Sequence, residues 1–235
     1  MSSTAPKPAL RLDWCTHAAA KYAVETWHYS RSLPPPPHVR VGAWEGGKFI
    51  GCIIFSRGAT PELLKPYGLH TTEGCELVRV ALGVHFAPVS RIVAVALRFL
   101  RSQCPGLRLV VSFADPAEGH HGGIYQAGGW TYSGESAGSV EYIGPDGKRW
   151  HSRMISPSGV KKVYGQMRRV LRPDQCTRVD RPGKHRYLMP LDDEMRAQIA
   201  PLAKPYPKRS TCAETSTRDG APVAVGGATP TSALP

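Results

Sequence analysis

The stretch ELVRVALGVHFAPVSRIVAVALRFLRSQCPGLRLVVSF, residues 76–113, contains the pattern that decides the fold. Residues 76–84 form a β-rich run, which predicts a central strand. Pro88 stands where a helix begins, and the apolar residues after it repeat at the three-to-four spacing of a helix face. The continuous apolar run 107–113 is typical of a strand buried on both faces. The order strand, helix, strand predicts a right-handed crossover that places the two strands parallel.

Further elements are expected before this unit. Thr16 is in position to cap a helix over residues 17–27, and the four prolines 34–37 exclude a helix and favour an extended segment. Residues 39–56 contain two apolar runs separated by Glu45-Gly46-Gly47, where glycine supplies the unusual backbone angles of a tight turn. This spacing predicts a β-hairpin.

The second half of the chain completes the core and adds a basic insertion. The segment 123–130 predicts a short helix ended by glycines, and strands are expected at 130–134 and 185–191. Residues 139–155 read as a two-stranded ribbon, and 158–172 as an amphipathic helix with Lys and Arg on its outer face. The expected fold class is therefore α/β (α+β), a mixed central sheet flanked by helices, with a basic ribbon and helix near the C-terminus.

Composition places one domain between two tails. Residues 1–12 and 210–235 are predicted to be disordered because they offer little that is large enough to bury. Residues 13–209 are expected to form one domain, with the basic insertion at about 141–183. The sequence has neither an apolar run of spanning length nor a secretory signal pattern, so we expect a cytoplasmic protein.

The charge of the chain is concentrated in one region. With 41% hydrophobic and 20% charged residues the chain has the composition of a globular protein, and its formal net charge is +12. Residues 146–209 hold sixteen Lys and Arg against six Asp and Glu, so +10 of that charge lies there. A polyanion is therefore a plausible partner. The six cysteines show no CxxC pair and no zinc-like spacing, which predicts reduced thiols.

Three residues in the predicted core are candidates for chemistry. Arg79 interrupts an apolar strand and needs an anionic partner if it is buried. Asp115 follows a buried strand at its carboxyl end, where α/β proteins place their sites, and Tyr125 comes ten residues later. A tyrosine can donate a proton and an aspartate can accept one. The alternatives are an edge-exposed Arg79, an Asp115 that caps a turn and a Tyr125 that packs in the core.

Histidines and a helix start supply further candidates. His28 precedes the proline run, although a histidine near a helix end is more often a capping or surface residue. His120 and His121 are adjacent and point in different directions on regular backbone, which disfavours a metal-ligand pair. Ser90 and Arg91 add a hydroxyl and a cation to a helix N-terminus that suits a pyrophosphate. The loop before them lacks a glycine-rich phosphate turn, so an ordinary helix start is the alternative.

These motifs carry a resemblance to two related families. The hairpin, the ELVRVALGV strand, the following helix, LVVSFAD and IYQAGGW together resemble the acyl-CoA N-acyltransferase (GNAT) fold. WHYSRSLP, the Arg79 strand, SFADP and GGIYQAGGW are similar to the Mom proteins of phages, which convert adenine in DNA to an N6-carbamoylmethyl derivative and shield phage DNA from host restriction. The similarity is clear over residues 14–130, looser to 208 and absent from the tail.

The resemblance implies roles for individual residues. Those matching the family's catalytic positions are His28, Ser30, Arg79, Asp115 and Tyr125. It implies acetyl-CoA or a related acyl-CoA as cofactor, bound by Val80, Leu82, Ser90 and Arg91. The loop HFAPVSR departs from the family pattern because it stands in place of the glycine-rich acyltransferase signature. Iron is a further candidate cofactor, which the spacing of the Cys and His residues does not support.

The charge pattern and the resemblance agree on double-stranded DNA with a flipped adenine as partner. An enzyme that acts on the amine of adenine must extrude the base, stack it on aromatic rings and hold the flanking phosphates with cations. Trp27, Tyr29 and Trp130 are candidate stacking rings. The candidate phosphate contacts are Lys148, Arg149, Lys161, Lys162, Arg168, Arg169 and Arg172. An acetyltransferase for a small amine or a protein, and a non-catalytic DNA-binding protein, are the alternative functions.

Overall fold

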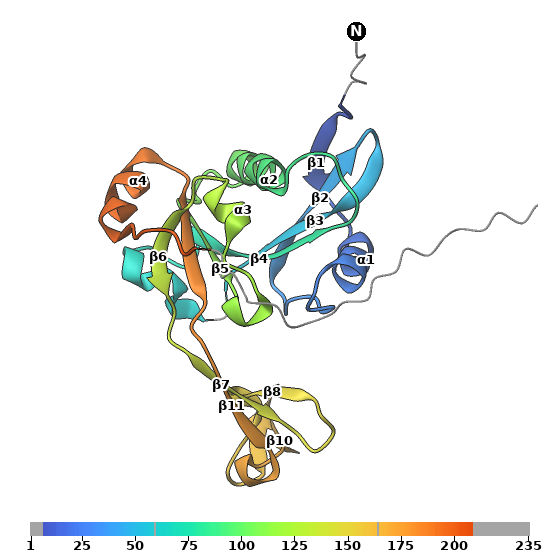
Figure 1. Cartoon of the computed structure of the whole chain (residues 1–235), viewed down its shortest axis with the longest axis vertical. Coiled ribbons are helices and arrows are strands. Elements are labelled where there is room, and N and C mark those ends of the chain that lie inside the picture. Colours follow the sequence, from blue (N-terminus) through green and yellow to red (C-terminus); the bar gives the residue numbers. More distant parts are fainter. Residues whose placement is uncertain (1–6, 59, 164, 209–235) are drawn as a thin grey trace, which may run out of the picture.

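The computed structural model describes residues 7–58, 60–163 and 165–208. Its core is a seven-stranded sheet in the order β1-β2-β3-β4-β5-β12-β6 (Figure 1). The strands in that order are β1 (Leu10–Trp14), β2 (His38–Glu45), β3 (Lys48–Ser56), β4 (Gly74–Leu82), β5 (Leu109–Ala114), β12 (His185–Pro190) and β6 (Thr131–Glu135). β4 and β5 are parallel, and the other neighbours in the sheet are antiparallel. The predicted class, a mixed sheet with helices, is confirmed.

Helices cover both faces of this sheet (Figure 1). α2 (Val89–Gln103) is the predicted crossover and buries Ile92, Ala96 and Leu100 in the largest apolar cluster, against one face. α1 (His17–Trp27) packs Ala20 and Val24 on the opposite face of β3 and β4, and the Thr16 side chain caps it as predicted. Because successive side chains of a strand point to opposite faces of the sheet, β3 and β4 each contribute residues to both clusters.

Two shorter helices complete the core. α3 (Gly123–Gln126) is the short helix expected after β5. α4 (Asp193–Ile199) was not predicted; Met195 and Ile199 pack it against β5 and β12. Short 3₁₀ turns lie at Pro61–Leu63, Lys65–Tyr67, Pro116–Glu118, Ser152–Met154, Pro173–Gln175 and Ala200–Leu202.

The basic insertion forms a separate lobe that projects from the core (Figure 1). It contains a three-stranded sheet in the order β11-β7-β8, made of β7 (Ser139–Ile143), β8 (Arg149–His151) and β11 (Thr177–Arg181). A separate two-stranded hairpin joins β9 (Val160–Val163) to β10 (Gln166–Arg169). The ribbon predicted at 139–155 is therefore present, and β11 adds a third strand to it.

The helix predicted over 158–172 is wrong, because this segment is the β9–β10 hairpin. Its apolar residues fit a helical spacing, but Gly165 adopts a left-handed backbone (φ 82°) between the two strands. Glycine supports that conformation without strain, and it weakens a helix interior by about 1 kcal/mol. The cations Lys162, Arg168 and Arg169, predicted for a helix face, are instead exposed on this hairpin.

The predicted N-terminal tail also needs correction. Residues 10–12 belong to β1, which pairs with β2 from Leu10 opposite Glu45 to Trp14 opposite Val41. The predicted C-terminal tail, 210–235, lies outside the described residues. No helix in the described part of the chain is long and apolar enough to cross a membrane.

Candidate functional site

A pocket opens where the two parallel strands separate. The ladder between β4 and β5 ends at the pair Leu77 and Ser112. Beyond this pair, a cavity of about 620 Å³ lies between residues 78–80 of β4 and 113–114 of β5. The end of α1 and the segment 119–125, which runs from a loop into α3, also line it. The carboxyl ends of parallel strands are where α/β folds commonly hold ligands.

A bulge in β4 determines where Arg79 points. The pairing with β3 shifts between Ile54, which lies opposite Arg79, and Phe55, which lies opposite Leu77. Val78 is the extra residue, and a bulge of this kind moves the side chains after it to the other face. Ile54 packs in the cluster beneath α1 and Phe55 in the cluster beneath α2. Arg79 therefore lies on the α1 side of the sheet.

Arg79 gives the pocket its charge. Its Nη1 donates to the carbonyl of Val78 at 2.7 Å, and its Nε donates to the carbonyl of Ser32 at 3.4 Å. Burial lowers the pKa of Arg79, and Tyr29 and Glu76 oppose that shift. Among the described residues that line the pocket, Arg79 is the one with a permanent charge. The pocket therefore favours an anionic group.

His28 ends α1 and lines the same pocket. Its Nδ1 accepts the main-chain N–H of Ser30 at 3.1 Å and lies 2.8 Å from Ser30 Oγ. Because Nδ1 is an acceptor, the proton of the neutral ring is on Nε2. Burial lowers the pKa of His28 to about 4, and the nearby Arg79 and His120 add to this shift. At neutral pH the ring is therefore uncharged and has an N–H to donate.

Tyr125 enters the pocket from the α2 side. Burial raises the pKa of its hydroxyl to about 12, so the phenol stays protonated at neutral pH. Ser112 Oγ lies 2.7 Å from the Tyr125 hydroxyl and 2.8 Å from the carbonyl of Leu77. This chain of hydrogen bonds anchors the phenol to β4. The structure thus brings Arg79, His28, Ser30 and Tyr125 to one region.

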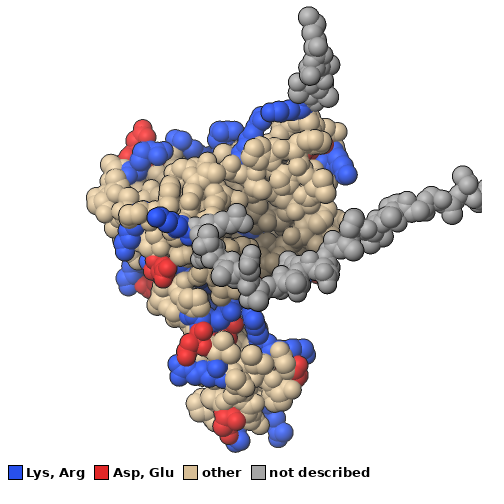
Figure 2. Space-filling model, in the orientation of Figure 1, with Lys and Arg blue, Asp and Glu red and all other residues tan. Residues whose placement is uncertain are grey.

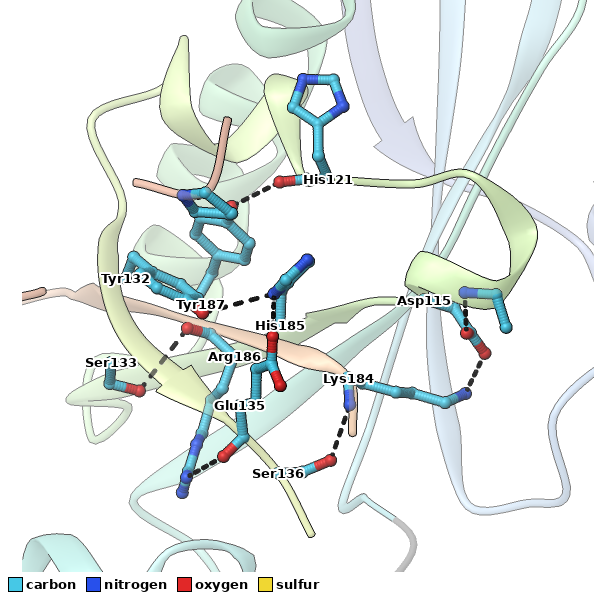
Figure 3. Close-up of polar contacts among 12 residues, drawn as sticks. Asp115, His121, Tyr132, Ser133, Glu135, Ser136, Lys184, His185, Arg186 and Tyr187 are labelled. Atoms are coloured by element: carbon cyan, nitrogen blue, oxygen red, sulfur yellow. Dashed lines mark hydrogen bonds and ion pairs between the residues drawn. The ribbon is translucent and has the colours of Figure 1, made fainter. Parts of the chain in front are cut away.

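Asp115 is not among the residues that line the pocket. Its carboxylate lies 2.9 Å from Lys184 Nζ and accepts the N–H of Ala117 at 3.0 Å (Figure 3). Burial alone would raise the pKa of Asp115, but these two donors outweigh burial and hold it below its usual value. The capping alternative describes these contacts. The sequence predicted that Asp115, Arg79 and Tyr125 converge in one crevice. The structure instead places Asp115 outside the lining of the pocket that contains Arg79 and Tyr125.

Glu118 makes a second link between the loop that follows β5 and the insertion. It lies 2.9 Å from Arg181 Nη2 and 3.6 Å from Arg149 Nη1. Arg181 also lies 3.4 Å from Glu141, and its side chain is only 16% exposed. We name the set Asp115, Glu118, Arg149, Arg181 and Lys184 the stem contacts. They tie the base of the lobe to the loop whose continuation, 119–125, lines the pocket.

The predicted phosphate contacts divide into two groups. Figure 2 shows Lys and Arg side chains distributed over the projecting lobe. Lys162, Arg168 and Arg169 are exposed on the β9–β10 hairpin, and no ion pair involves them within the described residues. The other four already contact protein groups: Lys148 with Asp146, Arg149 with Glu118, Arg172 with Asp174, and Lys161 with the carbonyl of Arg153.

A model of the Mom protein family matches residues 9–208. The chain belongs to the Mom family. The predicted resemblance is confirmed, and with it the class of transferase. A relative from Escherichia phage Mu, the methylcarbamoylase mom, is 26% identical over 207 residues, which cover 85% of this chain and 84% of that protein.

Solved structures give a more distant likeness. FeeM, an N-acyl amino acid synthase from uncultured soil microbes, has a TM-score of 0.42 and 12% identity, covering 81% of this chain and 94% of that one. A putative acetyltransferase from T. thermophilus has a TM-score of 0.38 and 15% identity, covering 86% and 97%.

The candidate stacking rings of this Mom-family chain differ in their exposure. Tyr29 is 54% exposed at the pocket and makes an edge contact with His120 at 5.2 Å. Trp27 also lines the pocket but is partly buried against Phe49. Trp130 is 1% exposed in the core, so the prediction that it stacks on a base is wrong. Its indole packs in the main apolar cluster, with its ring centroid 5.0 Å from that of Tyr125.

The predicted cofactor residues do not form one surface. Val80 and Leu82 both pack against the α2 cluster, and of the two only Val80 lines the pocket. Ser90 and Arg91 lie in the first turn of α2, as predicted. The two main-chain N–H groups at residues 86 and 87, which precede this helix, are bound by the carboxylate of Glu45. The N–H groups of residues 86 and 87 are therefore not free to bind a CoA pyrophosphate.

The remaining candidates are metal ligands and thiols. Within the described ranges, no group of three His, Cys, Asp or Glu side chains is placed to hold a metal ion. Cys15, Cys52, Cys75, Cys104 and Cys176 are free thiols.

Proposed function

We propose that this Mom-family chain modifies adenine in double-stranded DNA, transferring a carbamoylmethyl group to the exocyclic N6 amine. One observation carries the proposal: the pocket beside Arg79 is bounded by a loop that the stem contacts tie to a basic lobe. Such a link lets one surface hold the DNA backbone while the adjacent pocket receives a base. The relative from phage Mu, whose name states a methylcarbamoyl transfer, supports the same chemistry.

The substrate has to leave the DNA stack before it can react. A base inside a duplex hides its amine, so base-modifying enzymes extrude the nucleotide into a pocket. Tyr29, exposed at the pocket, offers a ring on which the extruded adenine can stack. The exposed cations of the β9–β10 hairpin supply phosphate contacts, each of which releases a counterion. The lobe therefore positions the duplex, and the pocket selects the base.

The pocket residues have distinct roles in this proposal. Arg79 attracts the anionic part of the donor or the phosphate of the flipped nucleotide, because the described lining otherwise lacks a permanent charge. Neutral His28 donates from Nε2, and Ser30 fixes the ring orientation through Nδ1. Tyr125 supplies a protonated hydroxyl at the base of the pocket. Asp115 holds the lobe through Lys184 and acts as a positioning residue rather than a proton acceptor.

Two other functions predict different products. An acetyltransferase for a small amine or a protein would not need the basic lobe. A non-catalytic DNA-binding protein would not need Arg79 and His28 in a pocket. Modification of phage DNA would protect it from host restriction, which is the biological role we propose.

Mass spectrometry of nucleosides separates these functions. DNA from cells that express the chain is hydrolysed and compared with DNA from cells carrying the empty vector. We expect a new deoxyadenosine species heavier by one carbamoylmethyl group. Unmodified DNA together with an acetylated protein or amine would favour the acetyltransferase, and unmodified DNA with a mobility shift of the duplex would favour a binding protein.

A further inference from the structure

The start of α2 is already occupied by an anion that belongs to the protein. Glu45, the last residue of β2, is 7% exposed. Its Oε2 accepts the N–H of Phe86 and its Oε1 accepts the N–H of Ala87, both at 2.7 Å. Both oxygens of one carboxylate thus bind consecutive main-chain donors directly before a helix of 15 residues. Contacts this short are typical of charge-assisted hydrogen bonds.

These donors are the ones that a phosphate would need. A loop that leads from a strand into a helix binds phosphate through successive main-chain N–H groups, helped by the positive end of the helix dipole. Pro88, the next residue, has no N–H, and the N–H of Arg91 already bonds to the Pro88 carbonyl. A pyrophosphate placed against residues 86 and 87 would meet the Glu45 carboxylate instead of free donors. Like charges at contact distance in a partly buried site repel strongly.

The surroundings keep Glu45 ionised and in place. Burial alone would raise the pKa of Glu45, but the two N–H donors, His85 and Arg91 outweigh burial and lower it. The backbone of Glu45 pairs with Leu10 of β1 on one side and with Lys48 of β3 on the other. These pairs hold the backbone that carries the carboxylate, and displacing the carboxylate itself would cost the two hydrogen bonds.

We propose that Glu45 is an internal anion that closes the α2 phosphate site, so that the donor of this enzyme is not held by a pyrophosphate at this loop. The inference rests on the proposed function only in that it concerns the donor of that transfer. A donor bound in the pocket is then held through Arg79, the one permanent charge among the described residues that line it. Glu45 acts as a specificity-determining residue because it excludes one class of ligand.

Nuclear magnetic resonance of the ¹⁵N-labelled full chain tests this directly, with CoA and inorganic pyrophosphate as probes. We expect the amide signals of Phe86 and Ala87 to stay unshifted at millimolar concentrations of either probe. Shifts confined to other residues would also support the assignment, since the loop would still be closed. A saturable shift of both amides on adding CoA would overturn it.

A gain-of-binding variant provides the second arm. Glu45→Ala removes the internal anion, and we expect pyrophosphate to bind this variant at least tenfold more tightly than it binds the wild type. Glu62→Ala, at an exposed carboxylate paired with Lys65, is the matched control and should gain nothing. A folded Glu45→Ala protein with wild-type affinity for pyrophosphate would contradict the proposal, and if the variant does not fold, the wild-type amide signals decide. Nucleoside analysis of DNA is independent of both arms, so failure here is distinct from failure of the proposed function.

Discussion

Lowering the pH should destabilise the protein through His28. Burial and Arg79 hold the pKa of His28 at about 4, against 6.5 for the ordinary side chain. Between these values the unfolded chain binds a proton that the folded chain does not, so the free energy of unfolding falls as the pH falls. The stability is fully present above pH 6.5 and is lost progressively towards pH 4. From pH 7 to pH 5 the loss through this residue is about 2 kcal/mol.

Urea unfolding at pH 7 and pH 5 measures this loss, with His28→Gln as the comparison. Burial also lowers the pKa of His38 and His151, so the wild type loses stability through them as well. The informative quantity is therefore the difference between the two proteins, and we expect the variant to lose about 2 kcal/mol less than the wild type over this range. The exposed His70→Gln variant is the control, since it leaves the buried imidazole in place.

A second readout and the contrary outcome complete the test. In the wild type, the ring proton signals of His28 should stay those of a neutral imidazole down to about pH 5. If His28 titrates near its ordinary pKa, or if His28→Gln keeps the full pH dependence of the wild type, the ring is not buried as a neutral donor. The role given to its Nε2–H would then be wrong.

Three further results are expected. Replacing Lys162, Arg168 and Arg169 by Ala should reduce the slope of log affinity for duplex DNA against log salt by up to about 2.7, at about 0.9 per phosphate contact; an unchanged slope would place the phosphates elsewhere. Arg79→Met should abolish modification with little change in melting temperature, and a large loss of melting temperature in ligand-free protein would reassign this arginine to the architecture. Asp115→Asn should lower modification while DNA affinity, measured by mobility shift, stays equal or rises, because a negative charge near the lobe is removed; wild-type modification would show that the stem does not position the substrate.

The sequence predicted the framework because periodicity reports directly on burial. The run 107–113 is apolar on both faces and became β5, and the helix after Pro88 became α2 with Ile92 and Leu100 inside. The helix expected at 158–172 is wrong because periodicity alone does not distinguish a helix from a hairpin in this segment. Its apolar spacing was helical, but Gly165 and the small lobe allowed a hairpin that needs little burial.

The site was less predictable because its decisive features are three-dimensional. The residues of β4 do not reveal the bulge at Val78, yet it determines the face on which Arg79 lies. Asp115 follows its strand as predicted, but its partner, Lys184, is far away in the sequence. Glu45 looked like a turn residue of the hairpin, and only the fold brings Phe86 and Ala87 to its carboxylate. Trp130 was expected to be a stacking ring, and only the fold shows that its indole is 1% exposed.

We propose that the enzyme modifies adenine in the pocket beside Arg79 while the basic lobe holds the DNA. The most direct measurement is the amount of modified deoxyadenosine, determined by mass spectrometry in DNA from cells expressing equal levels of the wild type, the Arg79→Met variant or the hairpin variant that lacks Lys162, Arg168 and Arg169. We predict a carbamoylmethyl-deoxyadenosine signal for the wild type, none for Arg79→Met and a reduced signal for the hairpin variant. Unmodified adenine in the wild-type sample, or equal modification by all three proteins, would contradict this central claim.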